Sequence, residues 1–420
     1  MDTRGAFVTC QHESDKKILY IEKTFRFVRY TYSLQESGHW MTALRGNDVA
    51  TLRWINSRAV LTELMSSPDE PLSVTELATR VALSRPTVEA ALADLVTEDW
   101  VIEASGLIQT PRAGRPARHY SFNAAAGLVM GIDLGPHSIV GLLSDLSGTV
   151  LHEVRRYDVD LATGEAALAA ILDVVATAAA GADAPVSGIG VITVGVPAIV
   201  NVDGDMVLTT VVPDWLESGI PERIREAFPR AITFFDNDAK LATLAEAEWG
   251  AARDSGTALF ILAGRRIAAG LIVNGQLMRG TRGAAGEIGA LQRMGWATSF
   301  SRFTDRIGIA AGSAGLETMM DAAVGGDVSL REAVAGYAAD IAEGIAALIL
   351  TVDPEIVVIG GGFARAGDAF LEPLRAAVGP MCLYEPPLVA SALGSQAVAL
   401  GAVARSLDHM RNHVLALGRE

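Results

Sequence analysis

The sequence predicts a small helical domain with a β-hairpin, followed by a larger α/β domain with mixed sheets. Up to residue 123, apolar residues recur at helical spacing in three segments, and two short β-prone runs follow them. After Asn123, short buried strands alternate with helices, a pattern typical of α/β architecture. A chain of 420 residues, half of them hydrophobic, is also too long for a single core. At least two domains are therefore expected.

Three helices are expected in the first domain. The first spans about 52–65, and the second begins at Ser73-Val-Thr-Glu76, a capping box in which each side chain satisfies an orphan amide. The third spans about 85–99 and accepts Pro86 in its first turn. Strands at 101–103 and 119–122 flank a loop rich in Arg, Gly and Pro. This pattern is typical of a winged helix-turn-helix, which we assign to residues 43–123. Residues 1–42 are interpreted as an N-terminal extension that is disordered or precedes the true start.

A winged helix predicts DNA binding because its recognition helix can lie in the major groove. Arg85 suits a bidentate contact with guanine, and hydroxyls beside it suit phosphates. A slim basic wing suits a narrow minor groove. The candidate DNA-binding residues are Ser84, Arg85, Thr87, Arg112, Arg115 and Arg118. The alternative is that this domain only mediates protein contacts.

The net charge of −15 opposes nucleic-acid binding unless it is unevenly distributed. Residues 1–125 hold 14 Lys and Arg against 15 Asp and Glu, and the remainder holds 20 against 34. The acidity thus belongs to the second domain. The two cysteines, Cys10 and Cys382, offer neither a disulfide framework nor a cysteine zinc site. No signal sequence or membrane span is expected, so we predict a cytoplasmic protein without a membrane partner.

The second domain, residues 124–420, shows strands and helices in alternation. Helices are expected at 164–180, 239–252 and 330–351, and Asn274-Gly275 predicts a type I′ hairpin. The expected strands are 128–134, 139–145, 150–155, 188–194, 232–235, 258–262, 271–273 and 355–359.

Several glycine-rich and acidic segments of this domain resemble, in order, those of the ROK family (repressors, open reading frames and kinases). They are Gly131-Ile-Asp133-Leu-Gly135, residues 188–200, Asp236-Asn237-Asp238-Ala239-Lys240, Gly283-Ala-Ala-Gly286-Glu287-Ile-Gly289, residues 356–362 and residues 394–402. With the winged helix, the resemblance covers about residues 43–408. It implies an actin-like, ribonuclease H-like domain of two lobes, related to sugar kinases, that binds a ligand and forms a homodimer or tetramer.

The resemblance also assigns roles to single residues. It implies that Asn237, Asp238 and Glu287 bind the sugar, and that a kinase of this family would use Asp238 as general base and Asp133 on the magnesium side. The alternative at this segment is that Asp236 or Asn237 only caps the helix that follows.

The sequence departs from the kinase pattern at the second phosphate loop and at the zinc loop. Where the family has a run of glycines, this chain reads Gly264-Arg265-Arg266-Ile-Ala-Ala-Gly270. Ala290 stands where the family often has the His that closes a Gly-Glu-x-Gly-His segment, and residues 291–311, where the family has a Cys-rich zinc loop, hold no Cys or His. We therefore predict that kinase activity is lost, that there is no metal or cofactor, and that Trp296, Phe300 and Phe303 fill the space beside the ligand.

The sequence thus predicts a DNA-binding transcriptional regulator, a repressor, with a duplex DNA operator and a sugar or sugar derivative as effector. One alternative is an ATP-dependent sugar kinase with a DNA-binding appendage. Another is a ligand-free dimeric DNA-binding protein.

Overall fold

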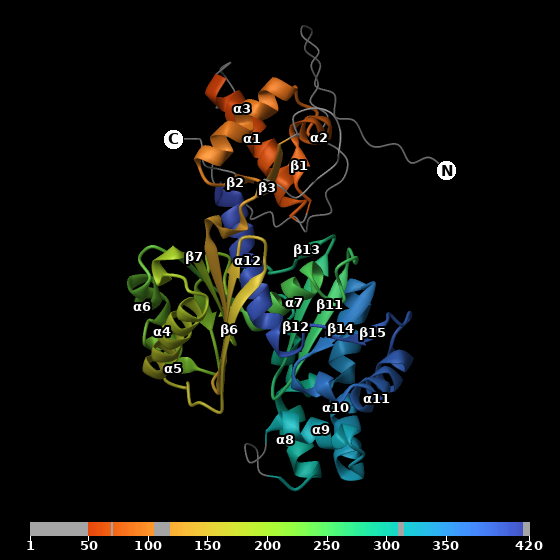
Figure 1. Ribbon diagram of the computed structural model, residues 1–420. Coiled ribbons are helices and arrows are strands. Elements are labelled where there is room, and N and C mark those ends of the chain that lie inside the picture. The colour runs from red at the N-terminus through yellow and green to blue at the C-terminus, as the bar shows by residue number, and fades with distance from the viewer. Residues whose placement is uncertain (1–48, 69, 105–117, 310–314, 415–420) are drawn as a thin grey trace, which may run out of the picture.

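The computed structural model describes residues 49–68, 70–104, 118–309 and 315–414 (Figure 1). The predicted extension at 1–42 and the wing arginines Arg112 and Arg115 lie outside the described residues.

The described part of residues 49–122, which we call the N-terminal module, contains three helices and a three-stranded antiparallel sheet of order β1-β3-β2. Its elements are α1 (Val49–Met65), β1 (Leu72–Ser73), α2 (Val74–Arg80), α3 (Arg85–Thr97), β2 (Val101–Glu103) and β3 (His119–Phe122). The capping box is confirmed, because the Ser73 amide donates to Glu76 Oε2 at 2.8 Å and the Glu76 amide to Ser73 Oγ at 3.3 Å. The predicted helices and strands are confirmed, and β1 is an additional strand.

The first lobe of the larger domain is built on a five-stranded sheet of order β10-β7-β4-β5-β6. The strands are β4 (Leu128–Leu134), β5 (Ser138–Asp145), β6 (Val150–Tyr157), β7 (Ile189–Val196) and β10 (Ile232–Asn237). β4, β7 and β10 run parallel, whereas β4, β5 and β6 form an antiparallel meander. Its core is completed by α4 (Gly164–Gly181), α5 (Pro213–Glu217) and α6 (Ile220–Ala227) (Figure 1). The hairpin of β8 (Ile199–Val200) and β9 (Met206–Leu208) also contributes to this core.

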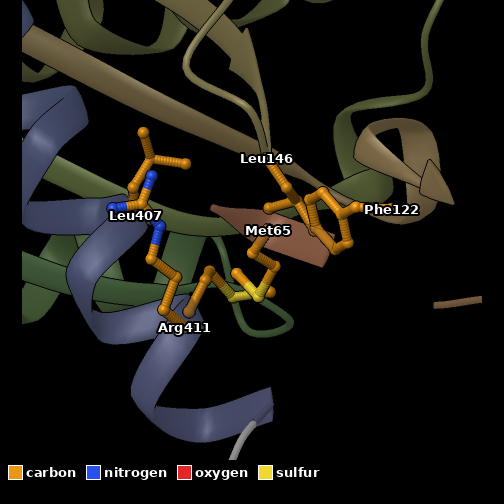
Figure 2. A pocket seen from close by; sticks show the side chains of 6 residues that line it. Met65, Phe122, Leu146, Leu407 and Arg411 are labelled. Atoms are coloured by element: carbon orange, nitrogen blue, oxygen red, sulfur yellow. The ribbon is translucent and has the colours of Figure 1, made fainter. Parts of the chain in front are cut away.

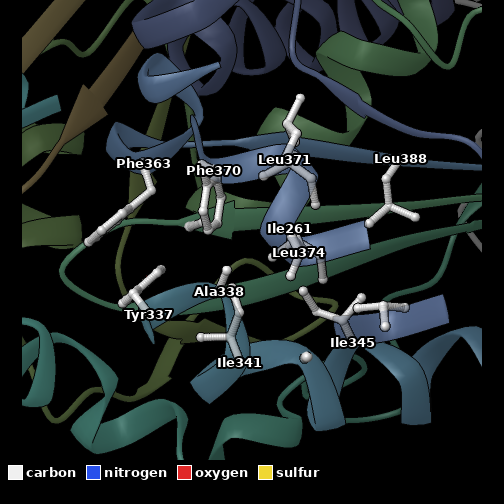
Figure 3. Packing of buried hydrophobic residues seen from close by; sticks show 14 of the residues in the cluster. Ile261, Tyr337, Ala338, Ile341, Ile345, Phe363, Phe370, Leu371, Leu374 and Leu388 are labelled. Atoms are coloured by element: carbon white, nitrogen blue, oxygen red, sulfur yellow. The ribbon is translucent and has the colours of Figure 1, made fainter. Parts of the chain in front are cut away.

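The second lobe has a sheet of order β13-β12-β11-β14-β15, covered by four helices. The strands are β11 (Ala258–Ala263), β12 (Ile267–Val273), β13 (Gln276–Leu277), β14 (Ile356–Gly360) and β15 (Leu388–Ala390). The helices are α8 (Trp296–Arg306), α9 (Leu316–Val324), α10 (Val328–Val352) and α11 (Asp368–Val378). Figure 3 shows the core between sheet and helices, where Tyr337 stacks on Phe363 with ring centroids 3.6 Å apart. Trp296 and Phe303 are buried in this core, and Phe300 packs against it.

Two helices, α7 (Asp238–Glu248) and α12 (Ala397–Val414), pack on each other where the two lobes meet (Figure 1). The two helices approach so closely that a Cβ added at Gly401 of α12 would lie 1.8 Å from the carbonyl oxygen of Leu241. A Cβ at Gly131 of β4 would lie 2.3 Å from the carbonyl oxygen of Ala399. α12 therefore rests directly on the backbone of both α7 and the first sheet.

Helices α4 and α10 are long and apolar enough to span a membrane by length and composition alone. Both are core helices of their lobes, and 61% of the most apolar window of α10 is buried.

Most predicted elements are present, with two informative differences. The helix expected to reach residue 252 ends at Glu248, because the Glu246 carboxylate accepts a hydrogen bond from the Ala251 amide at 2.8 Å and closes the helix end. β12 begins at Ile267 rather than 271, since it pairs with β11 along its whole length up to the arginine turn. The expected hairpin turn is confirmed by positive φ angles of 53° at Asn274 and 71° at Gly275.

Candidate functional site

The candidate effector site lies at the carboxyl ends of the parallel strands β4, β7 and β10. Asp133 of β4 and Asp236 of β10 are both opposite Gly195 of β7, so they lie in one row across the sheet. Asp238 follows on the first turn of α7. The carboxyl edge of a parallel sheet is a common place for ligands, because the loops and helix starts that follow the strands converge there.

Asp236 is fully buried and neutralised by two arginines. Arg279, which follows β13, donates to both carboxylate oxygens at 2.6 Å, and Arg405 of α12 forms a second ion pair. Burial alone would raise the pKa of Asp236, but the charges of Arg405 and Arg279 outweigh it and hold the pKa well below its usual range. Neither arginine could be predicted from the sequence, because neither belongs to a motif.

Asn237 caps α7, as the alternative interpretation of this segment predicted. Its Oδ1 accepts from the Lys240 amide at 3.1 Å, and its Nδ2 donates to the Ala198 carbonyl at 3.1 Å. Only 4% of the residue is exposed. A side-chain amide has two N–H donors and two acceptor lone pairs, so one donor and one lone pair remain for a ligand.

Asp133 and Asp238 contrast with Asp236, because among the described residues neither forms an ion pair. Both are half-buried. Burial, reinforced by the charge of Asp238, raises the pKa of Asp133 to about 7. Burial likewise raises the pKa of Asp238 to about 6, although a hydrogen bond from the Ala239 amide at 2.7 Å opposes the shift. The two residues that the resemblance assigns to kinase chemistry thus lie close together and lack a cationic partner in direct contact.

Lys240 joins this site to the segment that carries Glu287. Its side chain is fully buried, and Nζ donates to the Gly283 carbonyl at 2.7 Å. Burial lowers the pKa of Lys240, and the nearby carboxylates, Glu287 first, oppose the shift. Burial raises the pKa of Glu287, against the charge of Lys240. The structure therefore brings Asn237, Asp238 and Glu287 together, as expected of a shared site.

The turn between β11 and β12 brings two arginines toward this site. Arg265 and Arg266 are exposed, and the charge of Arg266 is one of those acting on Asp238. Among the described residues, no set of three or more His, Cys, Asp or Glu side chains has the geometry to hold a metal ion.

Of the four candidate DNA-binding residues within the described chain, Ser84, Arg85 and Thr87 lie at the start of α3. Ser84 caps this helix by accepting from the Thr87 amide at 3.3 Å, and the two hydroxyls lie 2.7 Å apart. Arg85 is exposed and donates to the Thr75 hydroxyl of α2. Arg118 forms a loose ion pair with Glu103 at 3.5 Å.

The N-terminal module shares a hydrophobic core with the first lobe and α12. A small hollow marks this junction, lined by Met65 of α1, Phe122 of β3, Leu146 and, from α12, Leu407, Met410 and Arg411 (Figure 2). The same α12 carries Arg405 of the Asp236 network, about half a helical turn before Leu407. One rigid helix therefore touches both the candidate effector site and the N-terminal module.

The ROK family profile matches residues 129–296 and 299–408. The xylose repressor of Caldicellulosiruptor bescii is 25% identical over 394 residues, covering 86% of this chain and 97% of that protein. The glucokinase of Thermotoga maritima is 28% identical over 311 residues, covering 65% of this chain and 95% of the enzyme. The crystal structure of a ROK family transcriptional regulator, a homologue of the E. coli MLC protein, superposes with a TM-score of 0.67 at 20% identity and covers 87% of this chain and 98% of that one. The alignment with the repressor is thus longer than that with the kinase by about a fifth of the chain.

Proposed function

Because the chain belongs to the ROK family, we propose that it is a DNA-binding transcriptional repressor controlled by a sugar or sugar derivative. Relatives named as xylose repressors support this, since their alignments span 97% of their own length. By the same proposal the chain acts as a homodimer or tetramer in the cytoplasm, and residues 43–123 are the DNA-binding domain. A two-fold dimer suits an operator with two related half-sites.

The observation that carries the proposal is the position of α12. Its Arg405 pairs with buried Asp236, which precedes Asn237 and Asp238 directly in the chain. Its Leu407 and Met410 pack against the N-terminal module. A ligand that moves β10 and α7 can therefore also move the N-terminal module, because α12 contacts both.

In the proposed mechanism, the sugar bridges the two lobes. Asn237 and Asp238 lie where β10 of the first sheet meets α7, and Glu287 follows the second sheet's hairpin. Amide and carboxylate groups that hold vicinal hydroxyls would draw these segments together and shift α12. A coupling free energy of about 1–3 kcal/mol, common in allosteric proteins, would change operator affinity about 5- to 150-fold.

We propose that α3 and the wing contact DNA. Arg85 supports this, because it lies exposed at the start of α3 and has no carboxylate partner among the described residues. Arg112 and Arg115 of the wing, with Arg118 beside it, would supply further positive charge to the minor groove and phosphates.

We propose further that phosphoryl transfer has been lost. Asp133 and Asp238 persist, which favours the sugar kinase as the second candidate function. However, the turn that should present glycine amides to phosphates carries Arg265 and Arg266 side chains instead. Incubation with magnesium, ATP and a panel of hexoses and pentoses tests this point. We expect no sugar-dependent ADP release, and turnover of any sugar would favour the kinase.

The test of the main proposal is operator binding by the full-length protein. DNA from upstream of its own and neighbouring genes is titrated by fluorescence anisotropy, with and without each sugar. Thermal unfolding distinguishes the ligand-free alternative, because a ligand at 100 times its dissociation constant adds about 2.7 kcal/mol of stability. No stabilisation by any sugar, together with firm DNA binding, would favour a ligand-free DNA-binding protein.

A further inference from the structure

Residues 278–287, which we call the interlobe segment, fold against β12 of the second lobe. The Met278 amide donates to the Leu271 carbonyl of β12 at 2.8 Å. Near the other end of the segment, a Cβ added at Gly286 would lie 2.4 Å from the carbonyl oxygen of Ala269, also in β12. Both ends of the interlobe segment are therefore held on the second sheet.

The same segment contacts the first lobe at two points. Arg279 donates to both carboxylate oxygens of Asp236 in β10. A Cβ added at Gly283 would lie 1.9 Å from the carbonyl oxygen of Val200 in β8, so the two backbones touch. Lys240 of α7 fixes this part of the segment, because its Nζ donates to the Gly283 carbonyl at 2.7 Å. The interlobe segment thus bridges the two lobes.

The carboxylate of Asp236 is shared between the interlobe segment and α12. Its Oδ1 accepts from Arg279 Nη1 at 2.6 Å and from the Asn237 amide at 2.9 Å. Its Oδ2 accepts from Arg279 Nη2 at 2.6 Å and also from Arg405 of α12. The Arg405 guanidinium lies over the Phe234 ring of β10 as well, 5.0 Å from its centroid. Because one oxygen accepts from both arginines, a displacement of Arg279 alters the contact that holds α12 to β10.

We propose that Arg279 is a positioning residue that transmits ligand-driven movement of the interlobe segment to α12, through the carboxylate that it shares with Arg405. This inference rests on the proposed function and names a residue on which the response of operator affinity depends. Glu287, a candidate ligand residue, lies at the end of the same segment. A ligand that draws Glu287 toward α7 moves Arg279 too, and the shift reaches Arg405 through the shared oxygen of Asp236.

A purely structural role is the alternative, because breaking a buried ion pair destabilises a protein whatever its function. Three quantities separate the two roles: the affinity for sugar, the operator affinity without sugar, and the ratio of the operator affinities with and without sugar. This ratio measures the coupling between the two sites. A structural role lowers the fraction of folded protein and leaves the ratio of the folded molecules unchanged, whereas a positioning role changes the ratio.

The test compares the full-length native protein with Arg279→Gln, with the panel of hexoses and pentoses as probes. Calorimetry gives the sugar affinity, and fluorescence anisotropy gives the operator affinity with and without each sugar. We expect Arg279→Gln to keep the sugar affinity and the sugar-free operator affinity within about threefold of the native values. The ratio of operator affinities should fall from about 5- to 150-fold in the native protein to less than about twofold.

Arg306→Gln is the matched control. Arg306 pairs with Asp340 at 2.7 Å within the second lobe, so its loss should lower the unfolding temperature and keep the native ratio. Arg279→Lys keeps the charge but loses the paired hydrogen bonds of the guanidinium, and it should lower the ratio at least about threefold. Should thermal unfolding show that Arg279→Gln does not fold, Arg279→Lys carries the test.

A native ratio in the folded Arg279 variant would overturn the inference. Loss of sugar binding in that variant would overturn it too, because Arg279 would then act on the ligand itself. An equal loss of response in Arg306→Gln would show a general effect of stability and count against the inference in the same way. In each of these cases the proposed function stands, since the native protein still responds to sugar. If no sugar of the panel alters the operator affinity of the native protein, both fail.

Discussion

Asp236 and Asp238 are two residues apart, yet their environments are opposite. Asp236 is fully buried and meets Arg279 and Arg405, so it stays ionised and holds β10 to α12. Asp238 is half-buried, meets no cation directly and has a raised pKa. The difference indicates that a charge satisfied inside the protein holds the fold together, whereas a charge without a direct partner is available to a ligand.

The largest expected effect is on stability, from Asp236→Asn. This change removes the buried carboxylate that pairs with Arg279 and Arg405, and breaking a buried ion pair typically costs about 3–5 kcal/mol. Urea unfolding measures the loss. Asp238→Asn is the matched control and should not destabilise the protein. Similar losses from both changes would contradict the distinction between the two residues.

The same contrast applies to arginines of the N-terminal module. Arg80 is paired with Glu63 at 3.2 Å and Glu70 at 3.0 Å, whereas Arg85 has no carboxylate partner among the described residues. Arg85→Ala should weaken operator binding about 10- to 100-fold, equivalent to about 1.4–2.7 kcal/mol, because it removes a base contact. Arg80→Ala should change it little. Anisotropy titration on one operator fragment compares them, and the reverse order would remove α3 from the contact surface.

Asp133→Asn should stabilise the protein at pH 8 by about 1–2 kcal/mol. The gain in stability is limited to this range because Asp133 is partly exposed and solvent screens its charge. Burial raises the pKa of Asp133 from about 4 in the unfolded chain to about 7 in the folded protein. Its contribution therefore weakens folding progressively as the pH rises from about 4 to 7, and the full penalty persists above 7. Unfolding at pH 4 and pH 8 tests this, since the variant should gain only at the higher pH. An equal gain at both would show that ionisation of Asp133 is not the cause.

The smallest effect is expected in the wing. Arg115→Ala should lower operator affinity on every sequence and reduce the slope of log affinity against log salt by about 1, as loss of one phosphate contact does. Titrations at three salt concentrations measure the slope. An unchanged slope would place Arg115 away from the DNA.

The sequence predicted the locally determined parts of this fold well. Strand 128–134 and the capping box of α2 follow from periodicity and from interactions within a few residues. It did not predict β1 or the last helix, α12. β1 has two residues, too few for a periodic signal, and α12 is defined by its packing on α7 and β4.

The candidate site shows the same limit. Asn237, Asp238 and Glu287 were found through motifs, and the structure brings them together. Arg279 and Arg405 are 43 and 169 residues from Asp236, so only the folded chain reveals their network. The sequence assigned no role to Lys240, yet its buried side chain joins α7 to the segment of Glu287.

The most direct measurement is operator affinity with and without a sugar or sugar derivative, in the native protein and in Glu287→Gln. It tests whether the candidate effector site and the N-terminal module are coupled through α12. We expect ligand to change the affinity of the native protein about 5- to 150-fold. The Glu287→Gln protein should bind DNA as tightly as the native protein does without ligand and should not respond to ligand. Operator binding that no ligand alters, or a full response in the variant, would contradict a sugar signal passing from this site to the DNA.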